Sequence, residues 1–173
     1  MKILIFGGNG QLGLELQKRA LDLEFEIVSP VQSELDITDQ PQVSFLANRI
    51  APNLIINAAA YTAVDQAEAE HERAYSVNRD GAAVVAIAAR DVRARLIHVS
   101  TDYVFDGEGR LPLDEGAPTN PINVYGASKL DGEREVLRIL ADKALVVRTS
   151  SLHGAKGQRG LLVLYPWQKY RQT

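Results

Sequence analysis

A phenol and an ammonium group stand four residues apart in this sequence, in Tyr125-Gly126-Ala127-Ser128-Lys129. Residues at this spacing share one face of a helix. The pattern predicts that the Lys129 ammonium lowers the pKa of the Tyr125 phenol, so that the tyrosine can transfer a proton near neutral pH. An isolated pair of this kind is also typical of a solvated helix face, so the position of the pair in the fold decides between the two interpretations.

A hydroxyl group at the end of a predicted strand could complete a proton-donating site. The predicted strand 95–100 ends at Ser100, which places Thr101 at the carboxyl edge of the predicted sheet, where open α/β sheets bind ligands. From there the Thr101 hydroxyl can hydrogen-bond a substrate carbonyl and orient it for hydride transfer, and a turn or cap role is the alternative. Thr101, Tyr125 and Lys129 are therefore the predicted catalytic residues of a reductase whose nicotinamide supplies the hydride.

A glycine turn, 7–13, lies between a predicted strand and a predicted helix, which is the context that a dinucleotide-binding turn requires. The first glycine permits the tight turn, the second lets the backbone approach a pyrophosphate, and the third lets helix and strand pack closely. Free N–H groups and the positive end of the helix dipole then hold the anion. A glycine-rich turn without a ligand is the alternative, disfavoured because glycines at a strand end cost stability. The predicted cofactor contacts of this turn are Gly7, Gly10, Gln11, Leu12 and Gly13.

The elements that must position these groups follow from short apolar runs that alternate with longer helical patterns, which is typical of βαβ units around a parallel sheet. Strands are predicted at 3–6, 26–28, 54–57, 95–100 and 144–148, helices at 11–23, 40–50, 71–90 and 124–140, and a loop at 106–121. Right-handed crossovers then predict a doubly wound α/β fold of the Rossmann type with strand order 3-2-1-4-5. Residues 1–153 form the predicted NAD(P)-binding domain, and 154–173 form a divergent tail in which 160–164 could be a strand.

The composition is that of an ordinary globular protein, with 46% hydrophobic and 24% charged residues and a formal net charge of -3. No basic run is present, so no nucleic-acid partner is expected. No apolar stretch reaches the ~20 residues of a membrane span, and the N-terminus lacks the pattern of a signal peptide, so no membrane partner is expected. The chain has no cysteine, which excludes disulfides and thiolate metal sites and fits a reducing cytoplasm.

The spacing of the three glycines resembles the extended short-chain dehydrogenase/reductase superfamily. Within that resemblance, Asp36 and Ile37 match the pair that meets the adenine of the cofactor. The alternative role for Asp36 or Asp39 is a helix cap before Gln40. The end of the second strand, 29–32, carries neither an acidic residue for ribose hydroxyls nor an arginine for a 2′-phosphate, so the choice between NADH and NADPH stays open.

Four longer motifs, 10–13, 57–65, 100–107 and 123–130, resemble the dTDP-4-dehydrorhamnose reductase family, and the resemblance covers about residues 1–157. It implies the NADPH- or NADH-dependent reduction of dTDP-4-dehydro-L-rhamnose, a 4-keto-6-deoxy sugar nucleotide, to dTDP-L-rhamnose. By this resemblance Tyr125 donates the proton, Lys129 also binds the nicotinamide ribose, and Thr101 positions the keto group. It further implies cofactor contacts at Ala58, Ala59, Ala60, Tyr61 and Asn78, and substrate contacts at Thr62, Val64, Thr101, Asp102 and Tyr103.

Glu15 matches a glutamate that, in some members of this family, helps bind Mg²⁺ at a homodimer contact. An exposed charge on the predicted helix is the alternative role for Glu15, and no other metal ligand is expected in this chain.

Two departures from the family pattern affect the expected function. Ser151 stands where family members often carry a tryptophan near the substrate. Family members are also nearly twice as long, and their C-terminal part closes over the sugar nucleotide. We therefore expect the substrate lobe to be largely missing, and our hypothesis is a truncated or frameshifted product.

Three alternative functions remain open at this point. The first is a nucleotide-sugar 4,6-dehydratase or epimerase, but Tyr103 stands where dehydratases carry a glutamate, which favours simple reduction. The second is a non-catalytic cofactor-binding module that resembles the regulatory subunit of methionine adenosyltransferase. The third is an inactive fragment of the reductase with an exposed sheet edge.

Overall fold

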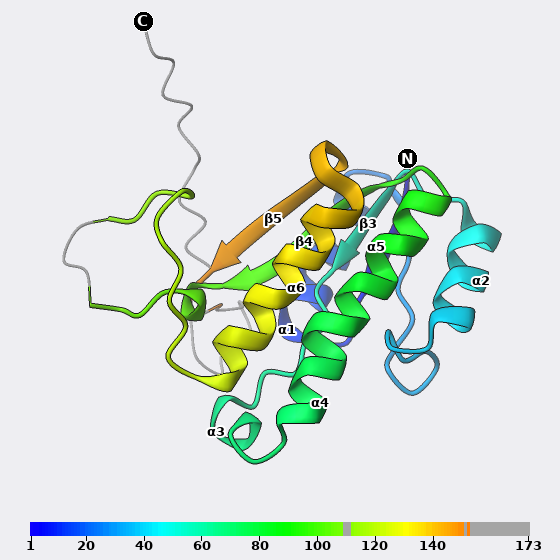
Figure 1. Cartoon of the computed structure of the whole chain (residues 1–173). Helices are drawn as coiled ribbons and strands as arrows, with labels where there is room; N and C mark the ends of the chain where they lie inside the picture. The colour runs from blue at the N-terminus through cyan, green and yellow to red at the C-terminus, as the bar shows by residue number, and fades with distance from the viewer. Residues whose placement is uncertain (109–111, 151, 153–173) are drawn as a thin grey trace, which may run out of the picture.

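A five-stranded parallel sheet forms the centre of the protein (Figure 1). The computed structural model describes residues 1–108, 112–150 and 152. The strands are β1 (Lys2–Phe6), β2 (Glu26–Val28), β3 (Leu54–Asn57), β4 (Arg95–Thr101) and β5 (Ala144–Thr149). Leu4, Ile5 and Ile55 have no exposed surface, as expected for parallel strands that are covered on both faces. Ser151, the tail 154–173 and the strand considered at 160–164 lie outside the described residues.

The parallel α/β sheet confirms the predicted fold class, but the predicted strand order 3-2-1-4-5 is wrong. The observed order is β2-β1-β3-β4-β5. β2 is a three-residue strand with no fully buried residue, so a strand placed beyond it would be poorly covered. β3 instead pairs with β1 and β4, and three of its four residues are buried. The order therefore reverses direction between β1 and β3, and ligands bind outside the carboxyl ends of such a pair of strands.

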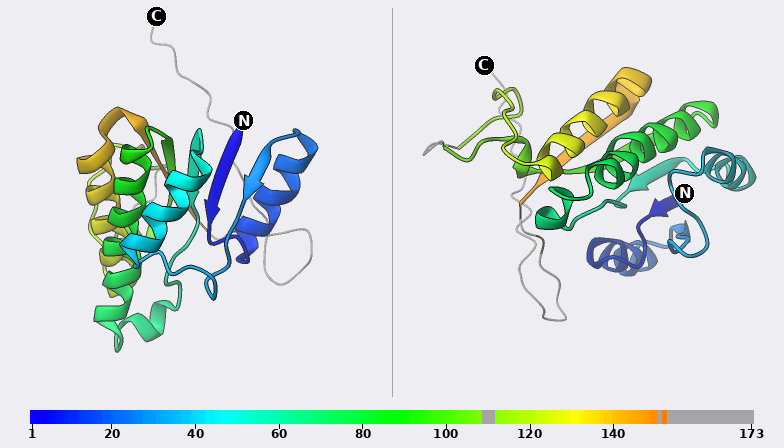
Figure 2. Two further views of the ribbon diagram at one scale, coloured as in Figure 1. Left: turned by 90° about the vertical axis from the view of Figure 1, so that its right-hand side faces the viewer. Right: turned by 60° about the horizontal axis from the view of Figure 1, so that its bottom comes forward.

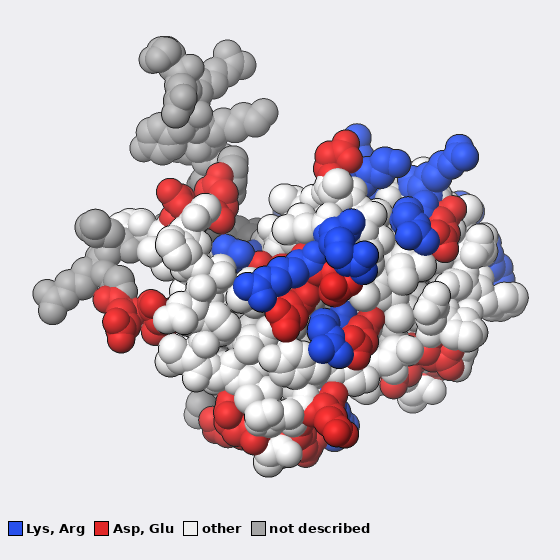
Figure 3. Space-filling model, viewed as in Figure 1, with Lys and Arg blue, Asp and Glu red and all other residues white. Residues whose placement is uncertain are grey.

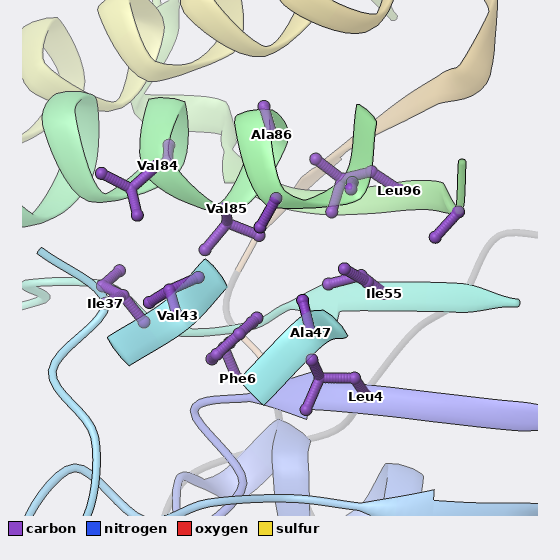
Figure 4. Packing of buried hydrophobic residues seen from close by; sticks show 14 of the residues in the cluster. Leu4, Phe6, Ile37, Val43, Ala47, Ile55, Val84, Val85, Ala86 and Leu96 are labelled. Atoms are coloured by element: carbon purple, nitrogen blue, oxygen red, sulfur yellow. The ribbon is translucent and has the colours of Figure 1, made fainter. Parts of the chain in front are cut away.

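Helices cover both faces of the sheet (Figure 2). Helices α2 (Gln40–Ile50), α5 (Ala82–Asp91) and α6 (Val124–Leu140) pack on one face, and α1 (Gln11–Asp22) packs on the other. Figure 4 shows Val43 of α2 and Val85 of α5 directed toward Phe6 and Ile55 of the sheet. This apolar cluster holds α5 and α6 against strands β1, β3 and β4.

The helix predicted over 71–90 is divided into three pieces: α4 (His71–Tyr75), the π-helical turn η1 (Ser76–Gly81) and α5. A wider π turn inside a helix is often found at a functional site. Helix α6 approaches η1 so closely that a Cβ atom on Gly132 would lie 2.1 Å from the Asn78 carbonyl oxygen. Apolar periodicity cannot distinguish such a turn from an α-helix, because the flanking residues Tyr75 and Ala82 have ordinary αR backbone angles and the helix continues through the turn.

Three short elements complete the described secondary structure: α3 (Val64–Ala67) and the 3-10 turns η2 (Asp102–Val104) and η3 (Ala141–Lys143). Each follows a strand or ends a helix, and none is long enough to give a periodic pattern. Their absence from the predicted elements is therefore a matter of length.

Many of the basic side chains in the described residues pair with a nearby carboxylate. Figure 3 shows side chains of both signs next to one another over α6 and its neighbours, with no continuous basic patch on this face. Arg134 pairs with Asp131 and Arg138 with Glu135 along the outer side of α6. Within the described part of the chain, no helix has the length and apolar character that crossing a membrane requires.

Candidate active site

A cleft of about 460 Å³ lies at the carboxyl ends of β1 and β3, which is the size of a small-molecule pocket. Residues from the glycine turn, the segment after β2, the end of β3 and helix α6 line it. The predicted site residues among them are Gly7, Gly10, Gln11, Leu12, Gly13, Asp36, Ile37, Ala58, Ala59, Ala60, Thr62, Tyr125 and Lys129. The fold therefore brings the glycine turn and the Tyr–Lys pair, more than a hundred residues apart in sequence, to one cleft.

The glycine turn leaves its backbone uncovered by side chains. Gly7 has a φ of +81°, and a Cβ there would lie 2.6 Å from the backbone of Ala58 and Ala59. A Cβ on Gly13 would lie 2.3 Å from the Gly7 carbonyl oxygen, so close helix–strand packing requires this glycine. Gly10 differs, because its Cβ would have only the Gly7 oxygen nearby, at 3.2 Å. The space in front of Gly10 is therefore open to a ligand.

Helix α1 presents an uncapped N-terminus to the same space. Gly10 is its N-cap residue, so no side chain caps the first N–H groups, and no acidic residue lies in the first turn. The positive end of the helix dipole and the free N–H groups together favour an anion. The turn and the helix thus fit the pyrophosphate of a dinucleotide.

The segment after β2 supplies the opposite end of the cleft. Asp36 lines it, and its Oδ1 accepts hydrogen bonds from the backbone N–H and the hydroxyl of Thr38, both at 2.9 Å. Asp39 instead caps α2 by accepting the N–H of Gln42 at 3.0 Å. Pro30 and Gln32 line the cleft where the ribose hydroxyls were expected, and neither is charged. The local charge therefore favours neither NADH nor NADPH.

Helix α6 carries the Tyr–Lys pair on the face that it turns toward the cleft. The Asn123 side chain accepts the N–H of Gly126 at 2.7 Å and so starts the helix one turn before Lys129. The Lys129 side chain is buried, and its Nζ donates to the Val99 carbonyl oxygen at 2.6 Å. Burial lowers the pKa of Lys129 from 10.5 to about 8, and the Glu133 carboxylate opposes this shift. The pair is therefore not the solvated helix face considered as its alternative.

The predicted lowering of the Tyr125 pKa is wrong for the protein without a ligand. Burial raises the pKa of the phenol, Asp102 and Tyr103 raise it further, and an interaction with the Thr101 hydroxyl lowers it in part. The Lys129 ammonium donates to the Val99 carbonyl oxygen and does not offset this rise. The phenol is thus held in its protonated form, which is the form that can donate a proton.

Thr101 ends β4 and is 5% exposed. Its Oγ1 accepts the N–H of Tyr103 at 3.2 Å and so caps η2, which is the alternative role named for it. The same hydroxyl donates to Asp102 Oδ1 at 3.2 Å, and its nearness to Tyr125 lowers the pKa of the phenol in part. Thr101 therefore combines a structural cap with a place beside the predicted proton donor.

Two of the predicted cofactor residues, Tyr61 and Asn78, do not line the cleft but brace it. The buried Asn78 side chain accepts the Tyr61 N–H at 2.9 Å and donates to the Tyr61 carbonyl oxygen at 3.1 Å. It also donates to Ser128 Oγ at 2.9 Å, and Ser128 Oγ donates to the Tyr125 carbonyl oxygen. Asn78 thus fixes the segment after β3 to helix α6.

Of the predicted substrate residues, only Thr62 lines the cleft directly. Asp102 and Tyr103 lie in η2 outside it, and Val64 begins α3. The Tyr103 ring is 45% exposed and meets the Tyr125 ring edge to face, with 5.5 Å between their centroids. Asp102 and Tyr103 thus lie beside the Tyr125 phenol.

Sequence reasoning missed several lining residues and one buried cluster. Ser100 and Thr149 line the cleft at the ends of β4 and β5, and the rule that selected Thr101 would have selected both. The missed lining residues are Phe6, Asn9, Pro30, Gln32, Leu35, Val77, Val99, Ser100, Thr149 and Leu152. The buried cluster contains Glu133, which pairs with the partly exposed Arg148, and its only signal in the sequence is that Glu133 follows Lys129 by four residues.

Glu15 pairs with Lys18 on the surface of α1, with 2.6 Å between Oε1 and Nζ. This contact agrees with the alternative of an exposed helix charge. Among residues 1–108, 112–150 and 152, no three His, Asp or Glu side chains come together as a metal site would require.

Comparison with known proteins gives one family over almost the whole chain. The profile of a family described as the RmlD substrate binding domain matches residues 1–172. A dTDP-4-keto-6-deoxy-D-glucose reductase of Streptomyces niveus is 40% identical over 98% of this chain and 59% of its own length. A dTDP-4-dehydrorhamnose reductase of Escherichia coli is 43% identical over 91% of this chain and 53% of its own. The chain thus spans somewhat more than half the length of these relatives.

Solved structures show the same relationship. The dTDP-4-dehydrorhamnose reductase of Bacillus anthracis, crystallised in complex with NADP, matches with a TM-score of 0.87 and 44% identity, over 91% of this chain and 56% of that protein. A UDP-glucose 4-epimerase of Brucella ovis in complex with NAD matches with a TM-score of 0.79 and 25% identity, over 85% of this chain and 51% of that protein.

Proposed function

Because this chain belongs to the family of the RmlD substrate binding domain, we propose that it binds NADPH or NADH and reduces dTDP-4-dehydro-L-rhamnose to dTDP-L-rhamnose. One observation carries the proposal: Tyr125 and Lys129 line the same cleft as the bare glycine turn, and Thr101 interacts with the Tyr125 phenol. A proton donor beside a dinucleotide cradle is what a carbonyl reductase needs. We propose residues 1–153 as the cofactor domain and the cytoplasm as the place of the reaction.

The proposed roles follow from the geometry of the described residues. When bound, the reduced nicotinamide supplies a hydride to the keto carbon. Tyr125 donates its phenolic proton to the keto oxygen, and the raised pKa of the phenol keeps that proton in place at neutral pH. Lys129, charged below about pH 8, lies one helical turn away and stabilises the phenolate that remains. Thr101 directs its hydroxyl to the keto oxygen and orients it.

The cofactor half of the proposal is tested by titrating the chain with NADPH and with NADH in a calorimeter. We expect saturable binding of at least one of them, since the turn and the α1 N-terminus need no other part of the reductase. No heat of binding with either dinucleotide at about millimolar concentration, above the range of typical substrate affinities, would contradict this half.

The chemical half is tested by NADPH consumption with the dTDP-4-keto sugar, in the parent chain and in Tyr125→Phe. The variant should lower the rate by about 10²- to 10⁴-fold, because it removes the proton donor. Its affinity for NADPH should stay unchanged, which the same calorimetric titration checks. An equal rate in both proteins would show that another group donates the proton. Binding without any turnover in the parent chain would favour the non-catalytic module instead.

The homodimer that the resemblance implies belongs to this proposal as well. Glu15 would contribute to it from the exposed face of α1, where it now pairs with Lys18. Sedimentation of the chain with and without Mg²⁺ tests it: a dimer that appears only with the ion supports the contact, and a monomer under both conditions contradicts it.

A further inference from the structure

An ion pair with a buried carboxylate, Glu133, and a partly exposed guanidinium, Arg148, lies behind the proposed active site and is unused by the mechanism above. Glu133 follows Lys129 by one turn of α6, and its side chain is 3% exposed. The Glu133 carboxylate accepts the Ser100 hydroxyl at 2.5 Å, Arg148 Nε at 3.0 Å and Arg148 Nη2 at 2.7 Å. An acidic residue is almost never this buried unless it is paired, and here both oxygens are engaged.

The partners of Glu133 come from the two strands that end at the cleft. Ser100 precedes Thr101 in β4, and Arg148 precedes Thr149 in β5. In the register of the two strands, Ser100 lies opposite Arg148 and Thr101 lies opposite Thr149. Arg148 also lies over the Phe105 ring, 5.1 Å from its centroid, at the start of the loop that follows η2. One carboxylate thus joins the helix that carries Tyr125 and Lys129 to the strand that carries Thr101.

We propose that Glu133 is a positioning residue of the site: its carboxylate, clamped between Ser100 and Arg148, holds the Tyr125–Lys129 face of α6 in place against the ends of β4 and β5. It also supplies the negative charge nearest to the Lys129 ammonium on this helix. The contribution of Glu133 to catalysis rests on the proposed reductase function. The contacts of Glu133 with Ser100 and Arg148 are independent of that function.

The charged and titratable groups around Lys129 in the described residues show why Glu133 is needed. On β4, His98 is buried, and burial together with the Lys129 charge lowers its pKa, so this ring stays neutral beside the ammonium. On β5, Arg148 is a cation bound to Glu133, and on α6 itself Tyr125 is a protonated phenol. Burial alone drives the pKa of Lys129 down, and Glu133 opposes it. Without Glu133, the ammonium would lose its proton at a lower pH.

The test is the pH titration of the Lys129 side chain, followed through its 13Cε chemical shift and assigned by the loss of the signal in Lys129→Arg. In the parent chain we expect a midpoint near the pKa of about 8. In Glu133→Gln the midpoint should fall by about one pH unit, the usual effect of removing a close opposite charge. Glu133→Asp keeps the charge and should restore most of the midpoint, which a merely structural role of the side chain would not do.

Glu135→Gln is the matched control, because Glu135 lies on the same helix but pairs with Arg138 on the surface. It should leave the Lys129 midpoint where it is in the parent chain. Equal midpoints in the parent and Glu133→Gln, or an equal fall in Glu135→Gln, would overturn the proposal.

Glu133→Gln leaves Arg148 without its partner and could therefore fail to fold. The double variant Glu133→Gln with Arg148→Met removes both charges of the pair and replaces the guanidinium with an apolar side chain. It should fold and still show the lowered midpoint, and a parent-like midpoint in it would overturn the proposal. No cofactor or sugar enters these measurements, so a failure to bind NADPH would count only against the proposed function.

Discussion

The burial of the Lys129 ammonium opposes folding. Its side chain is buried, and burial lowers its pKa from 10.5 to about 8. Below pH 8 the amine is charged in both the folded and the unfolded chain, so the full cost is present, on the order of 3 kcal/mol. Between pH 8 and 10.5 the unfolded chain binds more protons, so the free energy of unfolding rises with pH in this window.

We expect Lys129→Met to raise the free energy of unfolding at pH 7 by up to about 3 kcal/mol, reduced by the free energy that the lost hydrogen bond to Val99 contributed. The same variant should abolish reduction. The advantage of the variant should shrink as the pH rises from 8 to 10.5, since the parent chain then loses the buried charge. Urea unfolding at several pH values measures the difference. A difference that stays constant from pH 7 to pH 10.5 would refute the electrostatic explanation.

At the scale of elements, the glycines of the turn have two different roles: Gly13 allows close packing, and Gly10 leaves space for a ligand. Gly13 faces backbone atoms that cannot move away, whereas Gly10 faces open space apart from one oxygen. Gly10 also has φ −73° and ψ 165°, which any residue can adopt. Substitutions at these two positions should therefore fail in different ways.

Gly10→Ala should change the free energy of unfolding by less than about 1 kcal/mol but weaken NADPH binding strongly, because the added methyl group fills the space in front of the turn. Gly13→Ala should destabilise the chain by roughly 1–3 kcal/mol, because its Cβ overlaps the backbone of Gly7 and Gly8. Chemical unfolding and calorimetric titration of both variants provide the two measurements. Equal losses of stability would mean that the two glycines have the same role.

The elements also show how far sequence reasoning reaches. The helices 40–50 and 124–140 are predicted to the residue, because Asp39 and Asn123 cap them and their apolar faces are periodic. The strand order failed because periodicity gives no information about which neighbour a strand pairs with. The residues of the cleft were found where a motif or a strand end marked them. Glu133 and Arg148 were not, since only packing reveals that a glutamate on a helix is buried against a partly exposed arginine.

At the scale of the whole molecule, the cleft lies on the seam between β1 and β3. Gly7 and Ala58 approach each other across it, so each half of the sheet supplies one wall. A dinucleotide in the cleft would contact both halves and would lose its site when they separate. Binding and folding are therefore thermodynamically linked in this protein.

We expect NADPH at a free concentration about 100 times its Kd to raise the free energy of unfolding by about 2.7 kcal/mol. For a chain of this size the midpoint of thermal unfolding should rise by roughly 5–10 °C. Differential scanning calorimetry measures the shift, and Gly10→Ala, which should bind poorly, is its control. A shift of the same size in both proteins would point to a site outside the cleft.

The clamp around Glu133 has a consequence for the order in which the protein folds. Ser100 and Glu133 are separated by 33 residues, and Glu133 and Arg148 by 15. Helix α6 can therefore form against β4 before β5 has docked, but the Glu133 carboxylate then has no cation and resists desolvation. The final closure of this loop neutralises the carboxylate and completes the site at the same moment. A chain with a half-assembled active site is thus also a chain with an uncompensated charge, and it reopens rather than persists.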